Sequence, residues 1–311
     1  MSEPPRSRFR SILRWTLPAG LALVLLPSWI LFLSGGMLAV AGWIALLLAG
    51  LALGPLSLLV LVVHAIRKRR FSPPMRAALV LGLVALWPGL WNVGLLTITF
   101  PYSLETSEPS ATVRLPSNET LRVGWGGDRV ATNYHASTPD QRWAYDLLVE
   151  PAGHGSEQLE DYGCYGTTVV APVSARVHMA TDGAPDHTPG QVSNDLENPT
   201  GNAVVLRLEA GTYLLIAHLK TGSVQVETGD RVQEGDPIGG CGNSGNTSEP
   251  HIHIHHQRQD PRRFPINFAE GLPLYFRDHD GPPMPVGGFD VDSAGGVVLT
   301  GDIVQHAAAA R

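Results

Sequence analysis

Residues 203–218 read AVVLRLEAGTYLLIAH, two short apolar runs separated by a polar turn that contains Gly211. Short runs of this kind, bounded by Gly, Asn, Asp and Pro, are typical of β-strands. The pattern recurs from residue 121 to about residue 266, and no segment there has a long helical period. We therefore expect an all-β barrel or sandwich. The runs expected to form strands include residues 168–171, 176–179, 203–208, 213–218 and 223–227.

The segments on either side of this region have a different composition. Residues 101–120 are polar and rich in Ser, Thr and Glu, which predicts a linker. Residues 267–311 are loop-like and form a C-terminal extension, with one further expected strand at 296–304 and an alanine-rich tail. The β domain is therefore expected to span residues 121–266.

The first hundred residues contain three apolar stretches, at residues 15–33, 37–65 and 77–100. Each is close to or longer than the ~20 residues that cross a bilayer as a helix. A cleaved signal peptide explains the first stretch poorly, because two more follow and no small-residue cleavage site is evident. Residues 1–100 are therefore expected to form a membrane region with three transmembrane helices, followed by a mostly-β domain.

Positive charges predict how these helices are oriented. Four arginines lie within residues 6–14, before the first stretch, and the run RKRR at residues 67–70 separates the second stretch from the third. The positive-inside rule places both groups in the cytoplasm. Three crossings then place the N-terminus inside and the C-terminal domain outside the membrane. A re-entrant segment in place of one crossing would reverse this assignment.

The charge of the rest of the chain argues against a nucleic-acid partner. Residues 1–100 carry nine basic residues and one acidic residue, a charge of +8, so the whole-chain charge of −6 leaves −14 for residues 101–311. That region has one lysine, Lys220, and no basic stripe. Its two cysteines, Cys164 and Cys241, are too few for a disulfide framework. They either form one disulfide outside the cytoplasm or are two unrelated buried residues.

Three histidines alternate with isoleucines in His251-Ile252-His253-Ile254-His255. On a strand all three imidazoles would lie on one face. Buried imidazole nitrogens need partners, and neutral imidazole is the commonest metal ligand in proteins. The preceding glycine-rich segment, residues 239–246, either brings backbone close to a substrate or is an ordinary connection.

Two further positions are candidates for chemistry. Asp146 lies among apolar residues, and a carboxylate there must pair with a cation or bind a metal. Arg142 is a candidate partner for it in a structural salt bridge. His218 ends the apolar run at residues 213–216 and is either a satisfied core residue or a catalytic group.

Together these segments resemble the lysostaphin (LytM) type of zinc metallopeptidase. The motifs are VETGDRVQEGDPIG at 226–239, GNSGNT at 242–247 and PHIH at 250–253, with GTTVVAP at 166–172 and AHL at 217–219 upstream in the right order. The resemblance covers roughly residues 121–258. It implies a β-sandwich of duplicated hybrid motif type, in which two intertwined sheet motifs surround a groove.

The resemblance also implies roles for individual residues. Asp146 and His253 correspond to zinc ligands, and His218 and His251 to two non-ligand histidines near the metal. Three protein ligands would leave one zinc position for water. His251 would orient or deprotonate that water, and His218 would stabilise the oxyanion of the scissile amide.

One position departs from the family pattern. The usual first ligand is a histidine four residues before the aspartate, where this chain has Arg142. His135, eleven residues before Asp146, is the expected replacement, because Asn133-x-His135 followed by Gln-Arg-aromatic-Ala-x-Asp resembles a subgroup of the family. The alternatives for this ligand are His154, His178 and His187.

The expected function is that of a membrane-anchored zinc metallo-endopeptidase in a bacterial inner or plasma membrane, with peptide bonds of cell-wall peptidoglycan as substrate. Arg142 leaves open an alternative, a non-catalytic module that binds cell wall or activates a partner hydrolase. A lipoyl- or biotin-type carrier shares the hairpin pattern of residues 226–239 but needs a lysine at an exposed turn. Lys220 lies upstream of that hairpin, which disfavours a carrier.

Overall fold

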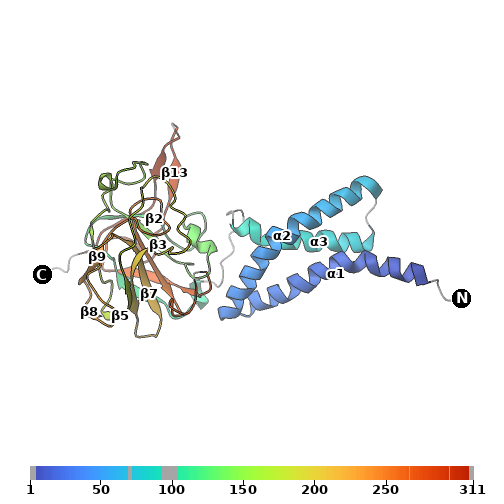
Figure 1. Ribbon diagram of the computed structural model, residues 1–311, viewed down its shortest axis with the longest axis horizontal. Helices are drawn as coiled ribbons and strands as arrows, with labels where there is room; N and C mark the ends of the chain where they lie inside the picture. The colour runs from blue at the N-terminus through green and yellow to red at the C-terminus, as the bar shows by residue number, and fades with distance from the viewer. Residues whose placement is uncertain are drawn as a thin grey trace. The chain divides into compact units, whose positions relative to one another are not determined.

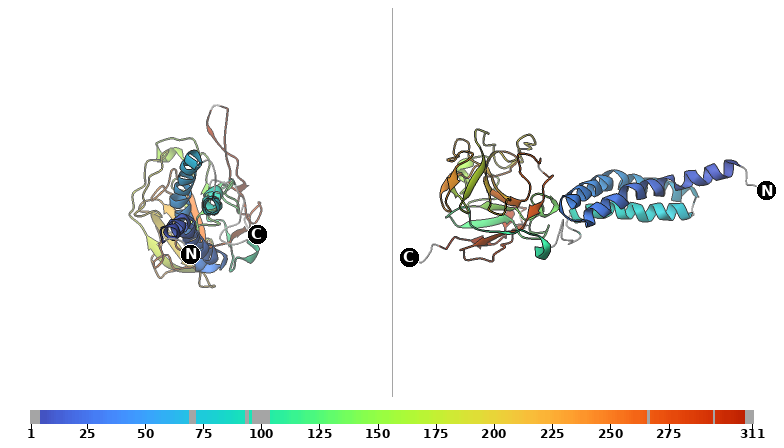
Figure 2. Two further views of the ribbon diagram at one scale, coloured as in Figure 1. Left: turned by 90° about the vertical axis from the view of Figure 1, so that its right-hand side faces the viewer. Right: turned by 90° about the horizontal axis from the view of Figure 1, so that it is seen from below.

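The computed structural model describes residues 5–68, 72–92, 95, 104–265, 267–293 and 295–307. The chain divides into two compact units, Met1–Pro101 and Tyr102–Arg311. In the first unit, helices α1 (Pro5–Leu33), α2 (Gly36–Lys68) and α3 (Pro73–Asn92) each pack against the other two (Figures 1 and 2). The predicted order of three N-terminal helices followed by a mostly-β unit is confirmed.

All three helices are long and apolar enough to cross a membrane, over Trp15–Leu33, Gly36–Arg67 and Pro73–Leu90. Small residues let them approach closely, as is common between membrane helices. A Cβ atom added at Gly50 would lie 2.7 Å from the carbonyl oxygen of Ala85. The predicted third stretch extended to residue 100, but residues 96–100 lie outside the described part of the chain. The orientation of the helices stays a prediction.

The second unit is built around one large antiparallel sheet. Among the described residues it contains nine strands in the order β15-β2-β3-β10-β7-β6-β5-β8, with β11 paired to β10. These strands are β2 (Leu121–Trp125), β3 (Tyr145–Leu148), β5 (Ala175–Thr181), β6 (Asn202–Arg207), β7 (Tyr213–Leu219), β8 (Arg231–Val232), β10 (Ile252–Gln257), β11 (Gly271–Leu272) and β15 (Ile303–Val304).

Three two-stranded pairs and three short 3-10 helices complete the described part of this unit. Strand β1 (Ala111–Arg114) pairs in parallel with β12 (Leu274–Arg277). The antiparallel pairs are β4 (Thr168–Val170) with β9 (Pro237–Gly240), and β13 (Phe289–Val291) with β14 (Val297–Leu299). The 3-10 helices are η1 (Leu104–Thr106), η2 (Tyr134–Ser137) and η3 (Leu159–Asp161).

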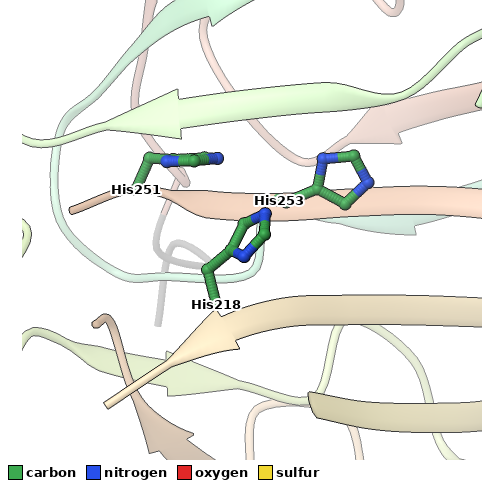
Figure 3. Close-up of side chains that lie close together, drawn as sticks. All are labelled: His218, His251 and His253. Atoms are coloured by element: carbon green, nitrogen blue, oxygen red, sulfur yellow. The ribbon is translucent and has the colours of Figure 1, made fainter. Parts of the chain in front are cut away.

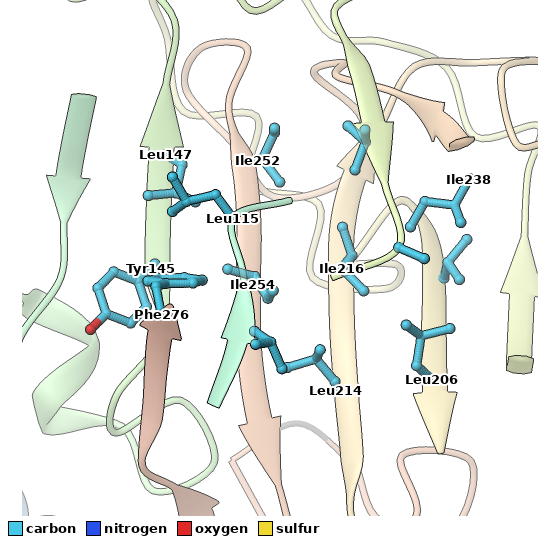
Figure 4. Packing of buried hydrophobic residues seen from close by; sticks show 14 of the residues in the cluster. Leu115, Tyr145, Leu147, Leu206, Leu214, Ile216, Ile238, Ile252, Ile254 and Phe276 are labelled. Carbon is cyan, nitrogen blue, oxygen red and sulfur yellow. The ribbon is translucent and has the colours of Figure 1, made fainter. Parts of the chain in front are cut away.

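The hydrophobic core lies between one face of the large sheet and the pairs β1–β12 and β4–β9 that cover it (Figure 4). Ile252 and Ile254 of β10 and Ile216 of β7 face this core and are completely buried. Ile238 of β9 and Phe276 of β12 pack onto them from the covering layer. Apolar burial of this kind contributes roughly 25 cal/mol per Å². The arrangement agrees with the expected sandwich of two layers.

Most of the expected strands are present, and one is not. Residues 168–171, 176–179, 203–208 and 213–218 correspond to β4, β5, β6 and β7 within a few residues. The expected strand at 223–227 was wrong. That segment is held by single contacts rather than by a ladder, such as the Gln225 N–H that donates to the carbonyl of Ile238.

The segments beside the predicted domain contribute to its sheets. Residues 111–114, which lie in the segment expected to be a linker, form β1, and Ala111, Val113 and Leu115 are buried in the core. Their period-two spacing is a strand signal that the polar neighbours hid. The C-terminal extension supplies β11, β12 and β15. Residues 101–103 and the tail from 308 to 311 lie outside the described residues.

The two cysteines form a disulfide between Cys164 and Cys241. The bond joins the segment before β4 to the residue that follows β9. Backbone hydrogen bonds run beside it, from Gly166 N–H to the carbonyl of Cys241 and from Cys241 N–H to the carbonyl of Thr167. Of the two possibilities for these residues, the structure has the pair.

Candidate metal centre

Three neighbouring strands bring the candidate ligands together. In the central strand β10, His253 lies directly opposite Asp146 of β3 on one side and Ala217 of β7 on the other. Directly opposite residues of adjacent strands point to the same face of a sheet. Because Ile252 and Ile254 face the hydrophobic core, His253 lies on the opposite face. All residues of β10 are nevertheless buried, so this opposite face is enclosed as well.

His218 reaches this face through a break in the alternation of β7. Leu214 and Ile216 face the core, so strict alternation would turn residue 218 towards the core as well. The pairing with β6 is irregular at this point, and His218 has φ of +61°. As a result Leu219 faces the core instead, and the His218 ring lies 5.6 Å from the ring of His253 (Figure 3). A bulge has thus redirected this side chain.

His135 comes from η2, outside the large sheet. The side chain of Asn133 caps this short helix by accepting from the His135 backbone N–H. The Asn133 amide also donates to the carbonyls of Gly127 and Ala144, which fixes the helix against the approach to β3. His135 Nε2 consequently lies 3.0 Å from Asp146 Oδ2.

The Asp146 carboxylate lies at the centre of a group of imidazoles. His253 Nδ1 is 2.8 Å and His251 Nε2 is 3.5 Å from Asp146 Oδ1, while His135 approaches the other oxygen. Burial alone would raise the pKa of this carboxyl, but the His135 and His251 imidazoles hold the pKa well below its usual range. Asp146 therefore carries a negative charge that these rings surround.

Arg142 is not the partner of Asp146. Its guanidinium is buried and donates instead to a carboxylate oxygen of Asp128 at 2.6 Å and to the Asp128 carbonyl at 2.8 Å. The indole of Trp143 donates to the same carboxylate at 2.7 Å. The structure thus contradicts the alternative of a salt bridge between Arg142 and Asp146, and the arginine is a structural residue of the loop before β3.

Within the described part of the chain, two groups of donor atoms could hold a metal ion, and both include His253. One consists of His135, Asp146 and His253, and the other of His218, His251 and His253; in each, the donor atoms lie within 4.8 Å of one another. Only the first contains a carboxylate, whose charge favours a cation. Two imidazoles and one carboxylate are a donor set that zinc accepts while keeping one position open.

A chain of hydrogen bonds fixes which nitrogen of His253 is free. The Gln257 side-chain N–H donates to the carbonyl of Gln259 at 2.6 Å, so its oxygen accepts from His255 Nε2 at 2.9 Å. Burial lowers the pKa of His255, so the ring is neutral and its Nδ1 must accept from His253 Nε2, 2.9 Å away.

The other nitrogen of His253 then faces the carboxylate as an acceptor. Burial lowers the pKa of His253 to about 3, so this ring is also neutral and its Nδ1 carries a lone pair. This lone pair lies 2.8 Å from an oxygen of the charged Asp146. Two acceptors at this distance repel each other unless a cation lies between them. The residues present therefore fit a bound metal ion.

The two remaining histidines each expose Nε2 to the site. His218 Nδ1–H donates to the carbonyl of Ser244 and His251 Nδ1–H to the carbonyl of Glu249, both at 2.8 Å. Burial and the neighbouring His251 and His253 hold the pKa of His218 well below its usual value. Burial lowers the pKa of His251, but the charge of Asp146 outweighs it and raises the pKa. A bound divalent cation would offset that charge and leave His251 neutral.

The glycine-rich segment at 239–246 positions the His218 ring through a hydrogen bond to its backbone. Ser244, whose carbonyl accepts from His218, also receives the Asn202 N–H on its hydroxyl. A Cβ atom at Gly201 would lie 2.4 Å from Ser244, so this approach requires glycine. The segment thus positions a side chain of the site; a contact of its backbone with substrate stays a prediction.

A cavity of about 330 Å³ adjoins the centre on the side of His251. Asp146 and His251 contribute to its lining, together with Trp125 of β2, Glu249, and Phe289 of β13. Trp125 and Phe289 pack with ring centroids 4.6 Å apart. The cavity gives a ligand access to the histidine and carboxylate of the site.

The three alternatives for the first ligand lie outside both groups of donor atoms. His154 Nε2 is 3.2 Å from the carbonyl of Asp161, His178 is 2.8 Å from Asp260, and His187 is 3.8 Å from Asp195. The assignment of ligand and catalytic roles stays a proposal, but the structure brings together the five residues that the sequence singled out: His135, Asp146, His218, His251 and His253.

Sequence reasoning missed other residues at the site. Gln257 follows the histidine stripe at the next alternate position, so the strand period could have revealed it. Asp140 is buried near His135 and His255, and burial raises the pKa of its carboxyl. Phe289 reaches the cavity from the C-terminal extension, and no local pattern in the sequence indicated this.

Residues 160–265 match the model of Peptidase family M23. The predicted resemblance to this peptidase family is confirmed. The matched residues include His218, His251 and His253, whereas Asp146 and His135 precede them. The structure, and not the family match, therefore brings these two residues to the site.

Solved structures of similar proteins include several peptidases. The chain is 14% identical to the catalytic domain of the prophage-encoded M23 protein EnpA from Enterococcus faecalis, with 52% of this chain and 93% of that one covered and a TM-score of 0.32. It is 20% identical to the catalytic domain of lysostaphin from Staphylococcus simulans (47% and 91% covered, TM-score 0.28). A zinc-containing peptidase from Vibrio cholerae is 15% identical (46% and 36% covered, TM-score 0.30).

The positive φ of His218 should be measurable as strain. Left-handed backbone costs a non-glycine residue about 1–2 kcal/mol, and glycine adopts it freely. We expect the His218→Gly protein to have a higher midpoint of thermal unfolding than His218→Ala, although both lose the imidazole. Differential scanning fluorimetry of both variants measures this. An alanine variant as stable as the glycine variant would show that the backbone is relaxed.

The hydrogen-bond chain behind His253 should strengthen metal binding. In Gln257→Leu the His255 ring loses the acceptor that fixes its tautomer, so His253 Nδ1 is no longer held as a lone pair. Loss of such an outer partner typically costs about 10–100-fold in metal affinity. Competition with a chromogenic zinc chelator measures the dissociation constant. Gln225→Leu, away from the site, serves as control, and an unchanged zinc affinity in Gln257→Leu would contradict the role of the chain.

Proposed function

We propose that this protein is a membrane-anchored zinc metallo-endopeptidase that hydrolyses peptide bonds. The observation that carries the proposal is the distance of 2.8 Å between His253 Nδ1 and a carboxylate oxygen of Asp146, two residues buried inside the domain. The match of residues 160–265 with Peptidase family M23 supports the class of reaction. The resemblance to lysostaphin-type enzymes supports peptides of cell-wall peptidoglycan as substrate.

His135, Asp146 and His253 would hold the zinc ion. When bound, zinc supplies a Lewis acid that polarises a carbonyl and makes a water molecule more acidic. His251 presents Nε2 to the same region, because its other nitrogen donates to a backbone carbonyl. In the neutral state this nitrogen accepts a proton, so His251 acts as the general base.

His218 faces the site with a neutral ring. Its Nδ1–H is engaged with Ser244, so Nε2 accepts a hydrogen bond in the neutral form and donates one only after it is protonated. Stabilisation of an oxyanion by His218 therefore requires that Nε2 first takes up a proton. His251 accepts the proton that the attacking water releases, so the proton on His218 comes from solvent.

Two features of the chain support the proposed location of the domain. Three apolar helices long enough to cross a membrane precede it, and basic residues flank them on the side that the positive-inside rule places in the cytoplasm. The Cys164–Cys241 disulfide is a bond that persists in oxidising compartments and is rare in the cytosol. Both features support a peptidase domain outside the membrane and an N-terminus in the cytoplasm.

The contacts of Arg142 and His135 give little support to the alternative function of a non-catalytic module. Arg142, the residue in favour of it, pairs with Asp128 away from the donor atoms. His135 reaches Asp146 in its place. Measurement of bound metal separates the two functions, because a module that has lost its metal predicts a purified protein without zinc.

Removal of one ligand should abolish both zinc binding and hydrolysis. We expect the wild-type protein to hold about one zinc ion per chain and His253→Ala to hold almost none, as measured by inductively coupled plasma mass spectrometry. Hydrolysis of muropeptides, followed by chromatography, should stop in the same variant. His178→Ala is a matched control, since this histidine contacts Asp260 and belongs to neither group of donor atoms. A His253→Ala protein that keeps its zinc and cleaves would contradict the assignment.

A further inference from the structure

The cavity beside the metal centre is lined by both polar and apolar residues. Besides Asp146, the lining contains a second acidic residue, Glu249, two residues before His251. The apolar lining comes from three parts of the chain. These are Trp125 of β2, Leu148 of β3, and Phe289 and Val297 of the C-terminal hairpin β13–β14. Figure 1 shows this hairpin projecting from the β domain.

The hairpin lies outside the segment that matches the peptidase family, which ends at residue 265. It is nevertheless fixed in place at its base. The Phe289 ring packs on Trp125, and the N–H groups of Gly287 and Gly288 donate to the carbonyls of Gly126 and Gly124. The apolar lining that it contributes is therefore a feature of this chain rather than of the matched segment.

The Glu249 carboxylate has no cationic side chain as a partner among the described residues. One carboxylate oxygen accepts from the Gly153 N–H at 2.8 Å, and this bond holds the side chain against the loop that begins at Gly153. Glu249 is half-buried and forms no ion pair with any residue that the structure describes. A carboxylate that is partly removed from water without a cation is a favourable partner for a cation brought by a ligand.

An aliphatic ammonium side chain matches both kinds of residue that line the cavity. Its methylene stem can cover apolar surface while its charged end reaches a polar group. Trp125, Phe289 and Val297 provide surface for the stem, and Glu249 provides the acceptor for the ammonium. A guanidinium pairs best with both oxygens of a carboxylate, and one oxygen of Glu249 already accepts from the Gly153 N–H, whereas a single oxygen is enough for an ammonium.

We propose that this cavity is a subsite for a lysine-like residue next to the scissile bond, with Glu249 and Phe289 as its specificity-determining residues. The assignment rests on the proposed function for the identity of the ligand as a peptide. It adds a preference for a primary ammonium on a flexible stem. Asp146 and His251 line the same cavity, so a side chain bound there places its own peptide backbone beside the site.

The subsite is tested by isothermal titration calorimetry, which measures the binding of uncleavable peptides to the zinc-loaded, full-length protein in detergent. The probes are four tetrapeptides with a ketomethylene group in place of the scissile amide. Two of them carry lysine and two carry norleucine, once on each side of that group. Norleucine keeps the stem and lacks the ammonium. Because a hydrogen bond between charged groups is worth roughly tenfold or more in affinity, we expect lysine to bind at least about tenfold more tightly than norleucine at one of the two positions.

Two variants identify the residues responsible. Glu249→Gln keeps the acceptor for Gly153 but removes the charge, and we expect the preference for lysine over norleucine to fall close to one. Phe289→Ala should weaken the binding of lysine and norleucine peptides by a similar factor, because it removes surface for the stem. The matched controls are Glu227→Gln, an exposed acid on another loop, and Val298→Ala, the neighbour of Val297 on the hairpin; both should bind as the wild type does.

Equal affinity of the wild type for lysine and norleucine at both positions would overturn the subsite. A preference that persists in Glu249→Gln would overturn the role of this carboxylate. Calorimetry of uncleavable peptides does not depend on turnover, so its outcome is separate from that of the zinc and hydrolysis assays. Selective binding of lysine peptides by a protein that does not cleave would support the subsite and contradict the proposed activity. Cleavage by a protein without a preference for lysine would support the activity and contradict the subsite.

Discussion

The buried carboxylate of Asp146 is the interaction on which the rest of the site depends. An uncompensated charge inside a protein is strongly unfavourable, so the surroundings must neutralise it. Here β10 provides His253, η2 provides His135, and the residue directly before β10 is His251. Since His253 is held as an acceptor by the chain through His255 and Gln257, a cation completes the arrangement better than a proton does.

The fold supplies this site by burying strand β10 on both faces. Ile252 and Ile254 fill the core between the two layers, and their contribution holds the strand in register. With the register fixed, the alternate residues His253 and His255 have no choice of face. The stability of the apolar layer thereby keeps polar groups buried that would not stay buried on their own. The same scaffold offsets the conformational strain of the left-handed backbone at His218.

Part of this could be predicted from the sequence because it depends on local period. The stripe His251, His253 and His255 follows from the alternation of a strand, and the three N-terminal helices follow from their apolar length. The side chain of His218 could not be placed by period, because a bulge and a positive φ set its direction. The sequence left a salt bridge between Arg142 and Asp146 open as an alternative, because the pairing of Arg142 with Asp128 depends on the folding of a loop that also brings Trp143 to Asp128.

Contacts between distant segments set the remaining features. The β1 strand and the hairpin that carries Phe289 lie on either side of the predicted domain in the sequence, and only the assembled fold shows that they belong to it.

The most direct test of the account is anomalous diffraction at the zinc edge from crystals of the protein. The account predicts a single peak about 2.0–2.2 Å from His135 Nε2, from a carboxylate oxygen of Asp146 and from His253 Nδ1. A zinc ion bound through His253 Nε2, or one that His135 does not contact, would contradict it.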